Sequence, residues 1–177
     1  MELTWGKSVK LNYDLDSVLV WARKCQLATK GEIVPDSLGV NQMCWEESAP
    51  DDFFTYLNNV FPLLDQFSQR HIRKGPRYCN IWEYQPGSEL VPHIDDKMEI
   101  YSTNLIVPII GRFTTNIIEP DNHNNVIDSI TYGPGECFLL NASKHWHKGK
   151  PVDEYRLAVM FYIKKEFDLD SYFDEVV

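Results

Sequence analysis

The second half of the chain alternates short β-prone runs with turn residues, and this pattern constrains the fold more than any other feature. The runs are RYCNIWEY (77–84), IYSTNLIVPII (100–110), RFTTNIIEP (112–120), NVIDSITY (125–132), ECFLLNA (136–142), HWHKG (145–149) and YRLAVMFYIKK (155–165). Gly, Pro, Asn and Asp separate them, and QPGSEL (85–90) and DNHNN (121–125) have the pattern of turns. Short strands without helices between them are typical of an antiparallel sandwich or barrel.

The first part of the chain has helical periodicity instead. Apolar residues fall on one helical stripe over 13–28, where Asp14 or Asp16 can cap the helix. A second stripe covers 48–71, where Ser48 is the expected cap and Pro62 should kink the helix or split it in two. We therefore expect a mainly β fold with N-terminal helices outside a jelly-roll core. The 177 residues suit one domain. We expect mixed helical support over 1–76, the core over 77–165 and a tail over 166–177.

Charge and cysteine usage narrow the choice of partner and compartment. The chain has 17 basic and 26 acidic residues, a net charge of −9. Binding to phosphate needs clustered Lys and Arg, so nucleic acid is a poor default partner. The four cysteines form no C-x-x-C motif, no basic-then-apolar leader is present and no apolar run reaches membrane-spanning length. A cytoplasmic protein with reduced thiols is expected; the sequence does not indicate its oligomeric state.

The segment PHIDD (92–96) carries the first chemical signal. His93 and Asp95 are two residues apart, so on an extended backbone their side chains point the same way. An imidazole and a carboxylate from one strand end supply two of the three ligands of a facial triad that binds non-haem Fe(II). The third ligand should come from a distant strand. His145 and His147, also two apart, are both candidates.

Arg156 lies in the most apolar of the predicted strands. A buried cation is costly without a partner, and arginine is suited to holding a carboxylate through two parallel hydrogen bonds. Near a metal site, this residue suggests a co-substrate with a carboxylate to be held. The simpler interpretation is a structural ion pair with Glu154 or Glu136.

The set HxD, distal His and Arg resembles the Fe(II)/2-oxoglutarate-dependent dioxygenases, especially their prolyl-hydroxylase and aspartyl/asparaginyl β-hydroxylase branches. The similarity runs in order from about residue 80 to residue 163, through YQPGSELVPHIDD and GECFLLNASKHWHKGKPVDEYRLAVMFYI. It implies a double-stranded β-helix, or cupin-like jelly roll. Arg156 follows His147 by nine residues, a spacing similar to that of the prolyl hydroxylases; from His145 the gap is eleven. The resemblance therefore implies His93, Asp95 and His147 as catalytic iron ligands.

The resemblance also implies where the co-substrate lies. Arg156 would hold the distal carboxylate of 2-oxoglutarate, and Tyr84, nine residues before His93, matches a tyrosine of that pocket. Val107 stands near the place of a second family tyrosine, and Asn104 near that of an arginine of the β-hydroxylases. Asn104 is predicted to contact 2-oxoglutarate, with Thr103 and Tyr101 as alternatives that the strand register decides.

The reaction implied by this resemblance is hydroxylation of a C–H bond, with O2 as oxidant and decarboxylation of 2-oxoglutarate to succinate and CO2. Asp95 argues against the related halogenases, which lack the carboxylate ligand. A peptide, a protein residue or a free amino acid is the expected substrate. Two other functions stay open. One is a cupin-like metalloenzyme that does not use 2-oxoglutarate, and the other is a non-catalytic β-sandwich binding module.

Overall fold

The computed structural model describes residues 5–28, 32–33, 37–44, 51–60, 80–95 and 101–164. The helices in these ranges are α1 (Leu15–Ala28) and α2 (Asp51–Val60). The strands are β1 (Gly6–Lys10), β2 (Glu32–Ile33), β3 (Ser37–Cys44), β4 (Asn80–Leu90), β5 (Tyr101–Ile110), β6 (Phe113–Glu119), β7 (Asn122–Tyr132), β8 (Glu136–Leu140), β9 (His147–Gly149) and β10 (Arg156–Lys164). No helix in the described part is long and apolar enough to cross a membrane.

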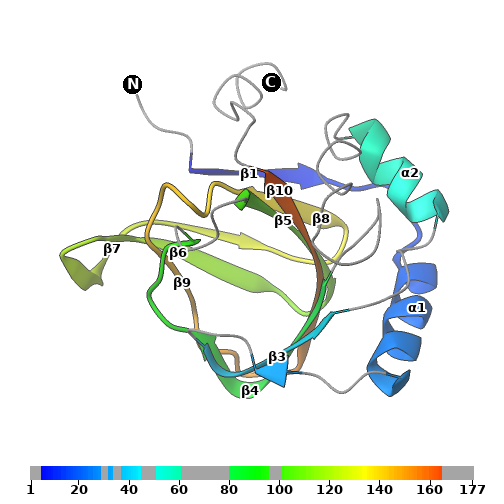
Figure 1. The fold of residues 1–177 in the computed structure, drawn as a ribbon, viewed down its shortest axis with the longest axis horizontal. Helices are drawn as coiled ribbons and strands as arrows, with labels where there is room; N and C mark the ends of the chain where they lie inside the picture. The colour runs from blue at the N-terminus through cyan, green and yellow to red at the C-terminus, as the bar shows by residue number, and fades with distance from the viewer. Residues whose placement is uncertain are drawn as a thin grey trace.

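Two antiparallel sheets enclose a common interior (Figure 1). The larger sheet has the order β1-β8-β5-β10-β4-β3-β2, and the smaller has the order β7-β6-β9. A β-bridge between His93 and His147 continues the smaller sheet beyond β9. The expected mainly β, jelly-roll fold class is confirmed.

The larger sheet separates two apolar layers. On β10, Leu157, Val159 and Phe161 belong to the layer shared with the helices, whereas Ala158 and Met160 belong to the layer between the sheets. This alternation follows from the strand, in which successive side chains point to opposite faces. The phase of a residue along its strand therefore decides whether it reaches the interior.

Both helices lie against the outer face of the larger sheet (Figure 1). In α1, Val18 and Ala22 are fully buried, and the backbone N–H of Asp16 donates to Asp14 Oδ1 at 3.0 Å. Asp14 is thus the N-cap, one of the two caps expected. α2 buries Phe53 at the expected spacing but begins at Asp51. The predicted cap at residue 48 and kink at residue 62 lie outside the described residues.

Two turn predictions need correction. The predicted turn at 121–125 is shorter, because β7 begins at Asn122 and pairs with Glu119. The predicted turn around Pro86 and Gly87 lies within β4, where Gly87 has a φ of 87° and the pairing with β3 is interrupted. A glycine accepts this left-handed conformation without steric cost. β4 can therefore bend there and continue towards His93.

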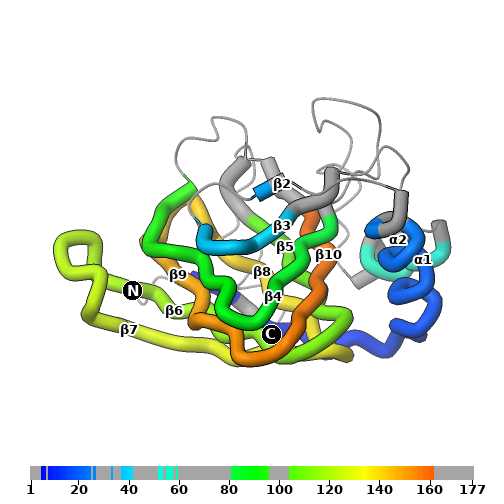
Figure 2. The backbone as a smooth tube through the Cα atoms, turned by 90° about the horizontal axis from the view of Figure 1, so that it is seen from below, coloured from blue at the N-terminus to red at the C-terminus, as the bar shows by residue number. Residues whose placement is uncertain are grey.

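The N-terminal region contributes more than helical support. Strands β1, β2 and β3 all pair into the larger sheet, β1 at one end beside β8 and β3 beside β4. Figure 2 shows the β6–β7 hairpin reaching away from the helices, beyond the rest of the smaller sheet. The division of the chain at residues 76/77 and the tail after residue 165 remain predictions.

Candidate metal centre

Two histidines face each other where β4 leads into the smaller sheet. The His93 N–H donates to the His147 carbonyl at 3.0 Å, and the His147 N–H donates to the His93 carbonyl at 2.9 Å. Directly opposed residues of an antiparallel pair project to the same face. The ring centroids are accordingly 4.3 Å apart.

Both rings are oriented in the same way by the backbone. His93 Nδ1 lies 2.7 Å from the Val91 carbonyl oxygen, and His147 Nδ1 lies 2.9 Å from the His145 carbonyl oxygen. A carbonyl oxygen only accepts, so each Nδ1 carries the proton and donates it. In a neutral ring, Nε2 then holds the free lone pair. Such a hydrogen bond fixes the tautomer and the orientation of a metal-binding histidine.

Asp95 completes a cluster with these rings. Its Oδ1 lies 3.7 Å from His93 Nε2, and one ligand atom from each of His93, Asp95 and His147 lies within 4.8 Å of the others. Among the described residues, this is the group of His, Cys, Asp or Glu side chains that could hold a metal ion. The structure brings the three sequence-predicted ligands together, and their role as iron ligands stays a prediction.

The electrostatics of the cluster favour neutral imidazole. Burial, together with the neighbouring His93, lowers the pKa of His147 to about 4, although Asp95 acts in the opposite direction. His147 is 3% exposed, so a charged ring there would lose its hydration. Metal ions bind the neutral ring, so at neutral pH His147 is already in its ligating form.

His145, the alternative third ligand, is not part of this group. It contributes its backbone carbonyl, which accepts the hydrogen bond from the His147 ring. The β-bridge explains the difference, because His147 is the residue directly opposite His93.

Asn104 holds the carboxylate in place. Its Nδ2 donates to Asp95 Oδ2 at 3.0 Å, and Asn104 is 7% exposed. The backbone N–H of Asp95 also donates to the Ala142 carbonyl at 3.1 Å. The structure shows Asn104 in contact with the carboxylate of Asp95, and the expected contact of Asn104 with 2-oxoglutarate stays a prediction. Nothing in the sequence signals this pair, since the two residues are nine positions apart on different segments.

The register of β5 determines which of its side chains face the interior. Val107 belongs to the layer beneath the helices, whereas Ile106 belongs to the interior layer. Asn104 shares the phase of Ile106 and faces inward. Val107 therefore faces away from the interior and cannot replace a family tyrosine there. The side chains of Thr103 and Tyr101 lie outside the described part.

Arg156 and Tyr84 are direct partners across β10 and β4 and face the interior. The Arg156 guanidinium lies 5.9 Å from the centroid of the Phe113 ring, and the Tyr84 ring lies 5.2 Å from it. The sequence did not single out Phe113, because an aromatic in a β-prone run is ordinarily core. Its position brings the two predicted co-substrate residues into one cluster.

The side chain of Arg156 is only partly satisfied. Its Nη2 donates to Asp153 Oδ1 at 3.0 Å, so the acidic partner is neither Glu154 nor Glu136. The Arg156 side chain is 11% exposed and that of Asp153 is 89% exposed. Within the part of the chain that the structure describes, the buried Nε has no hydrogen-bond partner. A guanidinium with an unused inward donor fits an incoming carboxylate.

Comparison with known proteins identifies the fold. No family model and no curated protein matches the sequence. Among solved structures, a Pseudomonas putida prolyl-4-hydroxylase matches with a TM-score of 0.64 and 11% identity, over 93% of this chain and 95% of that chain. The chain has the fold of the 2-oxoglutarate/Fe(II) oxygenases. This confirms the resemblance at the level of the fold.

Other proteins with this fold differ in their reactions. The viral collagen prolyl hydroxylase of Paramecium bursaria Chlorella virus-1, solved as its 2-oxoglutarate complex, matches with a TM-score of 0.62 and 13% identity over 91% of this chain and 96% of that chain. The non-heme α-ketoglutarate-dependent epimerase SnoN of nogalamycin biosynthesis matches with a TM-score of 0.63 and 12% identity, over 88% of this chain and 75% of that chain. The reaction must therefore be argued from the site.

Proposed function

We propose that this protein is an Fe(II)- and 2-oxoglutarate-dependent oxygenase that hydroxylates a C–H bond. The observation that carries the proposal is the His93–Asp95–His147 cluster, in which one ligand atom of each side chain lies within 4.8 Å of the others. Two histidines and one carboxylate leave further positions open on Fe(II). Bound iron would supply O2 activation coupled to decarboxylation of 2-oxoglutarate to succinate and CO2.

The roles of the protein side chains follow from their contacts. His93 and His147 would hold iron through Nε2, while their Nδ1–H groups keep the rings fixed on backbone carbonyls. Asp95 would provide the third ligand, kept in orientation by Asn104. The apolar layer between the sheets would keep water away from the reacting atoms.

Arg156 would bind the distal carboxylate of 2-oxoglutarate, with Tyr84 beside it. Both side chains contact Phe113, and Phe113 lies four residues before Ile117, which pairs with His147. Four residues of a strand span about 13 Å. Two inward-facing side chains and a five-carbon diacid can fill such a span. The unpartnered Arg156 Nε supports this assignment.

A peptide, a protein residue or a free amino acid is the substrate class that we propose. The net charge of −9 disfavours a nucleic-acid substrate. Cys137 is a free, buried thiol, as expected for a protein of the reducing cytoplasm, where we place this chain.

A metalloenzyme that does not use 2-oxoglutarate is the second candidate, because Arg156 already pairs with Asp153. The exposure of Asp153 makes that pair weak. Release of succinate from 2-oxoglutarate separates the candidates. We expect succinate formation to require Fe(II) and O2 and to stop when a chelator removes the metal. It should be lost in Arg156→Met but not in Arg112→Met. Metal binding without succinate, whatever amino acids or peptides are supplied, would favour the second candidate.

A further inference from the structure

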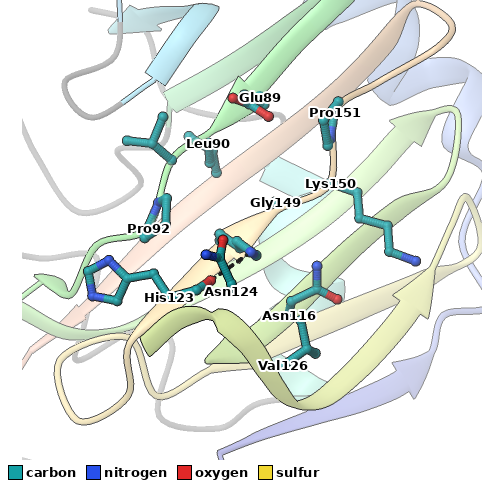
Figure 3. A pocket seen from close by; sticks show the side chains of 12 residues that line it. Glu89, Leu90, Pro92, Asn116, His123, Asn124, Val126, Gly149, Lys150 and Pro151 are labelled. Carbon is teal, nitrogen blue, oxygen red and sulfur yellow. Dashed lines mark hydrogen bonds between the residues drawn. The ribbon is translucent and has the colours of Figure 1, made fainter. Parts of the chain in front are cut away.

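A pocket of about 410 Å³ lies against the smaller sheet, beside the metal centre but outside its ligand set (Figure 3). Two segments form its walls, Glu89–Pro92 and Lys148–Pro151, and the start of β7 adds His123 and Val126. These wall segments directly adjoin His93 and His147. A pocket of this volume is in the range that accepts a small molecule or a residue of a peptide.

Asn116 of β6 is a buried polar residue in the lining of this pocket, and it is 3% exposed. Phe113 and Ile117 face the interior, so Asn116, in the opposite phase to both, faces the pocket. Figure 3 shows the Asn116 side chain near Lys150 among the residues that line the pocket. A side-chain amide offers two N–H donors and one acceptor oxygen, so Asn116 can hydrogen-bond to a polar ligand in the pocket.

The lining of the same pocket contains two lysines and one acidic residue. Lys148 Nζ donates to the His123 carbonyl at 2.8 Å, which holds the ammonium group near the β7 end of the pocket. Lys150 is exposed, and Glu89 is the single acidic residue in the lining. An ammonium group has three donors, so Lys148 keeps two for a ligand. This local excess of positive charge contrasts with the net charge of −9 of the chain.

Apolar groups complete the lining. Leu90, Pro92, Val126 and Pro151 surround the polar groups, so a ligand would have to present an aliphatic stem as well as an anion. We propose that this pocket binds a carboxylate on a short aliphatic stem. Such a group could belong to a glutamate side chain of a peptide or to a free dicarboxylate. The inference is independent of the proposed oxygenase function, because no residue of the metal cluster takes part.

NMR titration of the ¹⁵N-labelled, metal-free protein without 2-oxoglutarate tests the proposal. The probes are N-acetyl-glutamate amide, its neutral isostere N-acetyl-glutamine amide, and glutarate. We expect the Asn116 side-chain amide signals, assigned by their loss in Asn116→Ala, to shift with the glutamate probe and not with the glutamine probe. Tighter binding of the glutamate probe than of glutarate would identify a peptide side chain as the source of the carboxylate. Tighter binding of glutarate would identify a free dicarboxylate as the source.

Variants separate this pocket from the co-substrate site. Lys150→Gln should raise the dissociation constant of the glutamate probe by about tenfold, as loss of one charge-assisted contact would. The control Lys10→Gln removes an exposed lysine on β1 and should change nothing. The Asn116 shift should persist in Arg156→Met, in which no carboxylate can be held at Arg156. Equal shifts with both amide probes, or no effect of Lys150→Gln, would overturn the proposal.

Discussion

Single side chains decide whether the metal cluster is pre-formed, and Asn104 is the clearest case. Asp95 has one oxygen near His93 Nε2 and the other bound by Asn104, so its carboxylate is held from both sides. Removing the amide should free the carboxylate to rotate. Residues that orient a metal ligand typically contribute about 10–100-fold to metal affinity.

We therefore predict that Asn104→Ala weakens Mn(II) or Fe(II) binding by about 10–100-fold in anaerobic calorimetry. Asn59→Ala, at an exposed position of α2, is the matched control and should leave the affinity unchanged. A purely structural role of Asn104 would lower the unfolding midpoint without changing metal affinity, and that outcome would contradict the prediction.

A second prediction concerns the side chain of Arg156. Arg156→Lys keeps the charge but removes the Nε donor and the planar fork, so the dissociation constant for 2-oxoglutarate should rise by about tenfold or more. Arg112→Lys changes an exposed arginine and should have no effect. Calorimetry with the metal-loaded protein measures both constants. Unchanged affinity in Arg156→Lys would show that Arg156 belongs to a structural ion pair with Asp153.

The sequence predicts some of these residues better than others. The convergence of His93 and Asp95 follows from the two-residue repeat of a strand. His147 rather than His145 is what the resemblance to the prolyl hydroxylases implies, through the spacing to Arg156. The Asn104–Asp95 bond could not be predicted, because it depends on how two segments are placed in space. The partner of Arg156 was also missed, since three nearby acids compete and only the turn after residue 152 decides among them.

Among the elements, the β5–β6 connection links backbone conformation to the site. Gly111 has a φ of 75°, and a Cβ there would lie 2.8 Å from Arg156 Cγ. Gly135 has a similar φ of 85° but open space around it. Both glycines therefore have a left-handed backbone conformation, but a side chain would contact Arg156 only at Gly111 and not at Gly135.

Gly111→Ala should lower the free energy of unfolding and also weaken 2-oxoglutarate binding, because the new methyl group displaces Arg156. Gly135→Ala should show only the stability loss, about 1–2 kcal/mol for an L-residue in the left-handed region. Denaturant unfolding and co-substrate titration of both variants provide the measurements. Equal effects of the two variants on binding would mean that Arg156 does not depend on this contact.

Strands were predictable where β-prone runs are bounded by turn residues, as for β5 through β10. The bend in β4 has the sequence pattern of a turn, because Pro and Gly break local pairing in either case. Strands β1 to β3 were not predicted. Their pairing partners are far along the chain, and short segments such as Gly6–Lys10 carry no periodicity of their own.

The whole molecule places a buried, neutral histidine between two sheets, and this makes its stability depend on pH. Burial lowers the pKa of His147 to about 4 in the folded protein, from an ordinary value of about 6.5 for histidine. Between these values the unfolded chain binds more protons. Stability of the metal-free protein should therefore fall as the pH drops from above 6.5 towards 4.

The titration can be measured directly. We expect the His147 ring signals of the metal-free protein, assigned with His147→Gln, to stay in the neutral position down to about pH 5. Chemical denaturation over the same range should show His147→Gln with a shallower loss of stability than the wild type. A titration midpoint near 6.5 would show that the ring is not buried as described.

We propose that His93, Asp95 and His147 assemble an iron site that also binds 2-oxoglutarate. Visible absorption of the oxygen-free protein with Fe(II) and 2-oxoglutarate tests it most directly, because chelation of the iron by the 2-oxo acid produces a weak charge-transfer band. We predict the band in the wild type and in His145→Ala, and its loss in His147→Ala. No band in the wild type, or a band that survives His147→Ala and disappears in His145→Ala, would contradict the claim.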